Sequence, residues 1–430
     1  MTIGSAGGGP ETACALLGAW PPPYSTHPAS SMKWYAELPN MASKRPKWTA
    51  RGSRPQPRLP STLELVIDEI GARGDGVARH GETPVFVPFT TPGDTVVAKI
   101  DSRRGDGLAA TLVSVVAPGP ERVLPPCPYF GRCGGCSLQH WADAPYRAWK
   151  QGLLRQALRR AGLPEDALAP LIAIAPGTRR RVSFAFAKRG RKAHLGFNER
   201  ASHRLIDIEH CLLLAQPLER LIDPLRALIA GLSQDGEGDV VASCTETGID
   251  LLIESRQSLD LFDRERLAAF AVDQDLARLS WRSSANLPPE PLAARRPPLV
   301  RFADAAVTLP PASFLQPSSE GERALQSLVF DALGDARRVA DLFSGCGSFT
   351  FVLAQKADVL AVEGDEAALA ALKAATVGRR IRTERRDLAR RPLAGAELAG
   401  LDAVVFDPPR AGAQAQAEAL AESGPPLVVA

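Results

Sequence analysis

One stretch of this 430-residue chain has the residue types and spacing of a turn that binds a nucleoside. In DLFSGCGSF, an expected strand ends at Asp341 to Phe343 and is followed by Gly345 and Gly347. Glycines let the backbone approach a ligand closely, and the helix expected to begin beyond them is electropositive at its start. A second apolar run ends in an acid at Glu363, which can accept both hydroxyls of a ribose. We therefore predict a nucleoside-cofactor site at these residues.

The glycine spacing separates two possible cofactors. A dinucleotide fold favours G-x-G-x-x-G, and its third glycine would fall where the chain has Thr350. S-adenosylmethionine has no pyrophosphate and tolerates a looser pattern, so we predict this cofactor and keep an NAD-linked oxidoreductase as the alternative. Asp387 follows a third expected strand and is predicted either to meet the adenine amino group or only to cap a surface turn.

Another apolar strand ends in the segment VVFDPPRAGA, which offers an acid at the same kind of position. Asp407 is followed by Pro408 and Pro409, which remove backbone donors and stiffen the segment. Enzymes that methylate adenine or guanine amino groups use D-P-P-[YFW], but Arg410 takes the place of the aromatic residue and weakens that alternative. We predict that Arg410 pairs with a phosphate, orients Asp407 or serves as a structural cap.

Three of the seven cysteines stand together in CPYFGRCGGC, at Cys127, Cys133 and Cys136. In a chain whose first residues do not read as a secretory signal, such a cluster indicates a metal rather than disulfides. Thiolates suit either zinc or an iron–sulfur cluster, so the spacing leaves both open. The radical-forming C-x3-C-x2-C pattern does not occur here, which disfavours radical chemistry.

Hydrophobic patterning predicts the elements that must position these residues, in a multi-domain α/β chain. Residues 61–118 hold short β-rich runs between turns, typical of a small oligonucleotide-binding barrel. Residues 119–315 are predicted to form a central α+β domain that carries the cysteines, with a helix over 146–163. From 316 to 430, helices and strands alternate as in a Rossmann-like parallel sheet. Residues 1–60 are predicted to be a disordered tail.

The net charge and the hydropathy of the chain limit the kinds of partner that the sequence predicts. The net charge is only +3, so any contact with nucleic acid must come from local patches. Residues 147–204 hold 14 Lys or Arg against three acids, and with Phe184, Phe186 and Phe197 they predict an RNA-facing surface, although a solvated basic face has the same composition. The basic stretch 44–58 is likewise either a solvated tail or an arm that contacts RNA. No apolar run reaches 18 residues, so no membrane span is expected.

Taken together, these pieces resemble the RNA (uracil-5)-methyltransferase family over residues 61–430. The resemblance is carried by a TRAM-type barrel, the C-x5-C-x2-C cluster, FLQ, DLFSGCGSF, VEGD and FDPPRAG, and it is greater to the ribosomal RNA branch than to the tRNA branch. It implies that Gln316 contacts the cofactor and the target base, and that Asp407 hydrogen-bonds the uracil. It also implies that a [4Fe-4S] cluster, or less favourably zinc, is held by four cysteines: Cys127, Cys133, Cys136 and Cys211.

The resemblance also implies a mechanism. A cysteine thiolate adds to uracil C6, C5 then attacks the methyl sulfonium, and a general base removes the C5 proton. In the family the nucleophile follows a strand like PLVVA, in a Ser-Cys-Asn-Pro segment, and the base lies further on, whereas this sequence ends at Ala430. Cys346 and Cys244 are poor substitutes.

We therefore expect a truncated, inactive methyltransferase with an unpaired sheet edge near its end. We also expect it to be cytoplasmic and monomeric, with ribosomal RNA as its partner. The alternative is a non-catalytic RNA-binding metalloprotein.

Overall fold

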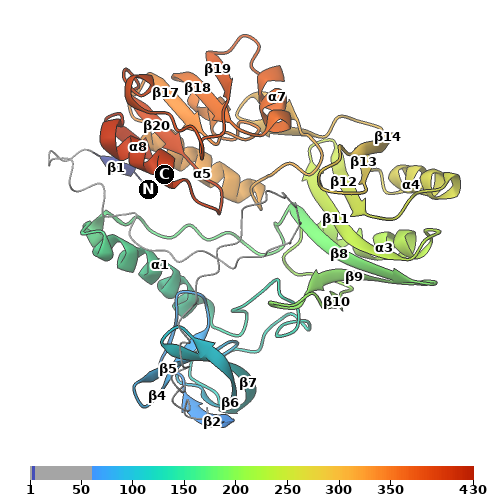
Figure 1. Cartoon of the computed structure of the whole chain (residues 1–430), viewed down its shortest axis with the longest axis vertical. Coiled ribbons are helices and arrows are strands. Elements are labelled where there is room, and N and C mark those ends of the chain that lie inside the picture. Colours follow the sequence, from blue (N-terminus) through green and yellow to red (C-terminus); the bar gives the residue numbers. More distant parts are fainter. Residues whose placement is uncertain (1, 5–60) are drawn as a thin grey trace, which may run out of the picture. The chain divides into compact units, whose positions relative to one another are not determined.

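The computed structural model describes residues 2–4 and 61–430 (Figure 1). The chain divides into two compact units, one of which contains Glu121–Ala430 and the other of which ends at Pro120. Within the described ranges, no helix has both the length and the apolar character needed to cross a bilayer.

The unit ending at Pro120 is a six-stranded sheet in the order β2-β6-β7-β5-β4-β3. Alternate side chains such as Leu65, Val85 and Val96 point to one side and form its core. The Asp94 carboxylate accepts the backbone N–H groups of Thr91 and Gly119 and fixes the turn region beneath the sheet. The strands are β2 (Thr62–Val66), β3 (Glu69–Ile70), β4 (Gly76–His80), β5 (Thr83–Val87), β6 (Thr95–Arg104) and β7 (Gly107–Ala117).

The central part of the chain forms a seven-stranded sheet in the order β10-β9-β8-β11-β12-β13-β14, covered by helices α3 and α4 (Figure 1). Phe184 and Phe186 are 0% and 2% exposed in its core, so the prediction that they face RNA is wrong. They alternate along β8 with outward residues, and the aromatic side chains take the buried positions because burial removes more apolar area from water. Its strands are β8 (Arg181–Arg189), β9 (Lys192–Asn198), β10 (Leu205–Asp207), β11 (Gly236–Thr245), β12 (Gly248–Ser255), β13 (Arg278–Arg282) and β14 (Glu290–Ala294); its helices are α1 (Asp143–Arg160), α2 (Gln216–Glu219), α3 (Ile222–Ala230) and α4 (Leu261–Asp273).

The C-terminal part is a doubly wound sheet in the order β1-β21-β20-β17-β18-β19, parallel except for β1. This agrees with the alternation predicted from the sequence. The helix expected beyond the glycine turn is α6, which contains only Thr350–Leu353. Because it is this short, its dipole adds little to the site. The other elements are α5 (Ser319–Ala332), β17 (Arg338–Leu342), β18 (Asp358–Glu363), α7 (Glu366–Ala374), β19 (Ile381–Arg385), β20 (Ala403–Phe406), α8 (Gln414–Ser423) and β21 (Leu427–Val429).

The edge of this sheet differs from the expectation. Strand β1 (Thr2–Gly4) pairs antiparallel with β21, residue by residue. The predicted open edge is therefore covered, and Thr2–Gly4 are not part of a disordered tail. An uncovered strand presents unpaired N–H and C=O groups, which a short added strand satisfies. The remaining predictions for residues 5–60 lie outside the described residues.

A hairpin of β15 (Leu299–Phe302) and β16 (Ala305–Thr308) precedes the boundary predicted at residue 315. Its buried residues Phe302 and Val307 nevertheless share one core with Phe351 and Leu372 of the C-terminal sheet domain. The hairpin thereby fixes the start of the segment that leads to Gln316.

Candidate cofactor and substrate site

The carboxyl ends of β17, β18 and β20 meet at one edge of the parallel sheet, where the strand order reverses on either side of β17. Ligands of doubly wound sheets bind in the crevice at this point. A cavity of about 90 Å³ lies there. Residues that line it include Phe343 and Gly345 after β17, Asp407 after β20, Ala368 of α7, and Gln316.

The glycine turn adopts a conformation that few other residues allow. Gly345 has φ +54°, and a Cβ on it would meet nothing within 4 Å, so open space lies beside its backbone. Gly347 has φ +97°, but there a Cβ would lie 2.6 Å from the Phe351 ring, so packing also requires glycine. Phe343 is a strained non-glycine residue at φ +62°, held by contact of its ring with Phe406. The turn is therefore rigid and open towards the cavity at Gly345.

Glu363 ties the turn to the next strand. One carboxylate oxygen accepts the N–H of Gly345 at 2.8 Å, and the other accepts the N–H of Asp365 at 2.7 Å. Each oxygen keeps a second lone pair, with which it can accept a ribose hydroxyl. Asp387 is exposed, its Cα lies 3.9 Å from where a Cβ on Gly364 would stand, and its carboxylate accepts the N–H of Ala389. Asp387 thus caps its own turn and does not line the cavity.

Three carboxyl groups lie close together beneath and beside the turn. Asp341 is fully buried and accepts the hydroxyl of Thr350, and burial, with smaller contributions from Asp407 and Glu363, raises its pKa to about 7. Partial removal from water also raises the pKa of Asp407 at the rim of the cavity. Arg410 is exposed, and no carboxylate of the described chain pairs with it. Asp341 therefore supports the turn from below, while Asp407 faces the cavity.

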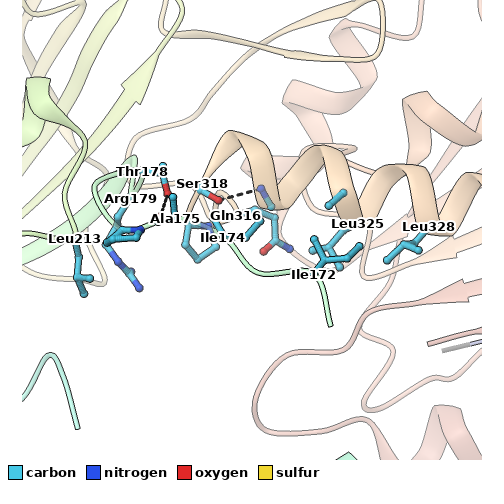
Figure 2. A pocket seen from close by; sticks show the side chains of 14 residues that line it. Ile172, Ile174, Ala175, Thr178, Arg179, Leu213, Gln316, Ser318, Leu325 and Leu328 are labelled. Atoms are coloured by element: carbon cyan, nitrogen blue, oxygen red, sulfur yellow. Dashed lines mark hydrogen bonds between the residues drawn. The ribbon is translucent and has the colours of Figure 1, made fainter. Parts of the chain in front are cut away.

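Gln316 lies between this cavity and a second, more open hollow of about 500 Å³ (Figure 2). Figure 2 shows the segment that contains Ile172 running beneath α5, next to Leu325 and Leu328. The hollow is mostly apolar, with Arg179 at the end away from Leu328. A side chain shared by two hollows can contact two ligands at once.

An ion pair that sequence reasoning missed holds this loop to the turn. Arg180 donates through Nε to the carbonyl of Gln316 at 3.1 Å and forms a 2.8 Å ion pair with Glu322, and both charged side chains are largely buried. Glu322 also accepts the hydroxyl of Ser348, which belongs to the turn, at 3.4 Å. These interactions therefore connect the residue before β8 to both walls of the cavity. The only sequence signal was the charged run TRRR, which does not identify its partner.

Four cysteines line one cavity of about 310 Å³ in the central part: Cys127, Cys133, Cys136 and Cys211. All four are half-buried free thiols, and burial is the main reason why the pKa values of the last three are raised. Within the described residues, no three Cys, His, Asp or Glu side chains are arranged to hold a single metal ion. Four thiols around one cavity are the donor set of either a zinc ion or an iron–sulfur cluster.

The two other described cysteines are unsuited to nucleophilic attack. Cys346 is buried within the turn, and burial raises its pKa to about 11. Cys244 lies on β11 and also has a pKa raised to about 11 by burial. A thiol with this pKa is almost entirely protonated near pH 7, whereas attack requires the thiolate.

Comparison with known proteins agrees with this arrangement. Residues 60–113 match the TRAM domain family. The chain is 42% identical to an uncharacterized RNA methyltransferase of Brucella suis over 374 residues, which cover 86% of this chain and 87% of that protein. It is 34% identical to the 23S rRNA (uracil(1939)-C(5))-methyltransferase RlmD of Alkalilimnicola ehrlichii, over 88% of each chain.

Among solved structures, the tRNA (uracil-54, C5)-methyltransferase of Pyrococcus abyssi, in complex with S-adenosyl-L-homocysteine, has a similar fold. The TM-score is 0.61 at 20% identity, over 83% of this chain and 87% of that one. The chain belongs to the RNA methyltransferase family that includes the 23S rRNA (uracil-C5)-methyltransferases.

Proposed function

We propose that this protein binds S-adenosylmethionine and presents a uracil of ribosomal RNA for methylation at C5. The observation that carries the proposal is the meeting of Gly345, Glu363, Gln316 and Asp407 at the switch point of the sheet, around one small cavity or directly beside it. The relative named as a 23S rRNA uracil-C5 methyltransferase supports ribosomal RNA as the substrate.

In the proposed complex the cofactor lies over the open side of Gly345. The carboxylate of Glu363, already oriented by two backbone N–H groups, accepts the ribose hydroxyls. Thr350, where a dinucleotide fold favours a third glycine, is fully buried and donates to Asp341, which argues against an NAD site. Asp387, on its own turn beside Gly364, remains a candidate contact to the adenine amino group.

The uracil enters between Gln316 and Asp407. Asp407 accepts a hydrogen bond from the ring N3–H when it is ionised, and Gln316 donates to a ring carbonyl and contacts the cofactor. Methylation then requires a thiolate that adds to C6, transfer of the methyl group from the sulfonium to C5, loss of the C5 proton to a base, and departure of the thiolate. In the overall reaction, the methyl group gained by C5 replaces the proton that leaves.

We propose further that the 430-residue chain holds both ligands without completing this reaction. The support is the state of its described cysteines: four line the cysteine cavity, and the pKa values of buried Cys346 and half-buried Cys244 are raised to about 11, which favours the protonated thiol. The alternative remains an RNA-binding metalloprotein without a cofactor.

Four thiols around one cavity support the proposal that a [4Fe-4S] cluster is held by Cys127, Cys133, Cys136 and Cys211, with zinc as the less favoured alternative. When bound, the cluster serves as a structural staple. It joins the loop after the barrel to the segment that follows β10.

The test combines three measurements on the purified chain. Isothermal calorimetry with S-adenosylhomocysteine is expected to detect binding, and RNA containing the target region is expected to bind in a fluorescence assay. Incubation with methyl-labelled cofactor and ribosomal RNA is expected to give no C5-methyluridine. RNA binding without cofactor binding would favour the metalloprotein, whereas efficient methylation would refute the proposed inactivity but support the site.

A further inference from the structure

Arg181 is a partly buried cation that has no acidic partner among residues 2–4 and 61–430, which the structure describes. It begins β8, and its Nε is buried without a hydrogen-bond acceptor in the described chain. Burial and the neighbouring Arg179 both lower the pKa of Arg181, and no carboxylate in the described part of the chain opposes them. A guanidinium removed from water without an anion is unfavourable, so the position calls for a negatively charged ligand.

Other arginines that are shielded from solvent do have carboxylate partners. Arg180, which directly precedes β8, pairs with Glu322 of α5. Further pairs are Arg226 with Asp207, Arg278 with Asp250, Arg282 with Glu254, Arg379 with Asp304 and Arg386 with Glu397. Arg181 therefore departs from the way this protein neutralises its cations.

Arg181 lies close to a residue that lines the cofactor cavity. Its guanidinium lies 6.0 Å from the ring centroid of Phe314, which lines that cavity and is 67% exposed. Arg179 is exposed and lines the hollow of Figure 2 together with Gln316. Arg179 thus lines the hollow beside Gln316, and Arg181 lies near Phe314, two residues before Gln316.

We propose that Arg179 and Arg181 bind a phosphodiester of the RNA strand whose uridine enters the cofactor cavity. This inference rests on the proposed function and names residues for its RNA contact. A guanidinium binds phosphate through two parallel hydrogen bonds, and two arginines can share one phosphodiester. The exposed Phe314 ring offers a stacking surface for a base next to that phosphate.

The cysteine cavity offers a second possible source of negative charge, because both arginines also line it. RNA is favoured because Arg179 is exposed and lines a hollow that opens to solvent beside Gln316. A charge confined to the cysteine cavity would account for neither feature. The experiment therefore measures metal content together with RNA affinity.

The test uses the full chain and a fluorescent single-stranded RNA oligonucleotide that contains uridine, with anisotropy measured from 50 to 300 mM salt. R179Q and R181Q are each expected to weaken binding about five- to tenfold and to reduce the slope of log affinity against log salt by about 0.7, the value for one phosphate contact on a single strand. R181K keeps the charge but loses the planar fork, so an intermediate loss is expected. R191Q removes the same charge from the turn at the far end of β8 and is expected to change affinity less than about twofold.

Four results would overturn the inference. Equal losses in R191Q and R181Q would mean that only total charge matters. Unchanged RNA affinity with reduced iron or zinc in R179Q and R181Q would assign the arginines to the cysteine cavity. Unchanged RNA affinity in both variants and in R181K, with normal metal content and normal S-adenosylhomocysteine binding, would refute the inference but leave the proposed function intact. A wild-type chain that binds no RNA would instead refute both.

Discussion

The buried carboxyl of Asp341 predicts an unusual dependence of stability on pH. Its pKa is raised from 3.8 to about 7, so the folded protein binds this proton more tightly than the unfolded chain does. At about 1.4 kcal/mol for each pH unit, the interval from 3.8 to about 7 corresponds to a cost of roughly 4 kcal/mol at pH 8. At pH 5 the folded carboxyl is protonated, and the remaining cost is roughly 2 kcal/mol. The destabilisation is thus complete above the folded pKa and decreases as the pH falls.

Asp341→Asn removes the charge and keeps an acceptor for the Thr350 hydroxyl. This variant should therefore be stabilised more at pH 8 than at pH 5. We expect its gain in the free energy of unfolding over wild type to be about 2 to 3 kcal/mol larger at pH 8 than at pH 5. Urea titrations followed by circular dichroism at both pH values measure this difference. Asp335→Asn, on the surface of the same domain, is the control and should show less than about 0.5 kcal/mol of such change. A wild-type-to-variant difference that does not vary with pH would refute the buried-charge reasoning.

Three further changes test other parts of the site. Glu322→Gln leaves the buried guanidinium of Arg180 uncompensated, so we expect urea titrations to show a free energy of unfolding lower by about 3 to 5 kcal/mol. A loss below about 1 kcal/mol would mean that the pair is solvated. Gly345→Ala forces a Cβ onto a left-handed residue whose open side is proposed to face the cofactor. Calorimetry should therefore show S-adenosylhomocysteine binding at least about tenfold weaker, and unchanged affinity would place the cofactor elsewhere. Cys211→Ser is expected to reduce iron in anaerobically purified protein by at least about half, whereas Cys244→Ser should leave it unchanged, and equal iron in both variants would exclude the cluster ligands proposed here.

Much of the doubly wound domain was predictable because its signals are local. The strand before the glycine turn is a continuous apolar run, and the left-handed conformations of Gly345 and Gly347 are available mainly to glycine. Acids at the carboxyl ends of parallel strands of one sheet, such as Glu363 after β18 and Asp407 after β20, must reach the same edge of the sheet once the strands pair. These features follow from backbone preference and strand direction, which neighbouring residues set.

The central domain was harder to predict because its basic and aromatic residues alternate on one strand. Composition placed Phe184 and Phe186 with the lysines and arginines, but the pleat of β8 sends the aromatic rings into the core. An exposed aromatic ring beside a cation is instead Phe314, which is more than 100 residues from Arg181 in the sequence. Composition gives the number of charges in a segment, but not which face of a strand they occupy.

The sequence by itself determined the glycine turn, the acids at the strand ends and the cysteine cluster, because each depends on residues within a few positions of one another. Only the tertiary structure decided that Arg180 pairs with Glu322, that Thr2–Gly4 cover the edge strand β21, and that Arg181 has no carboxylate partner among the described residues. Those outcomes depend on which distant segments pack together. The free energy of a buried charge is set by that packing, through the water it removes and the partner it supplies or withholds.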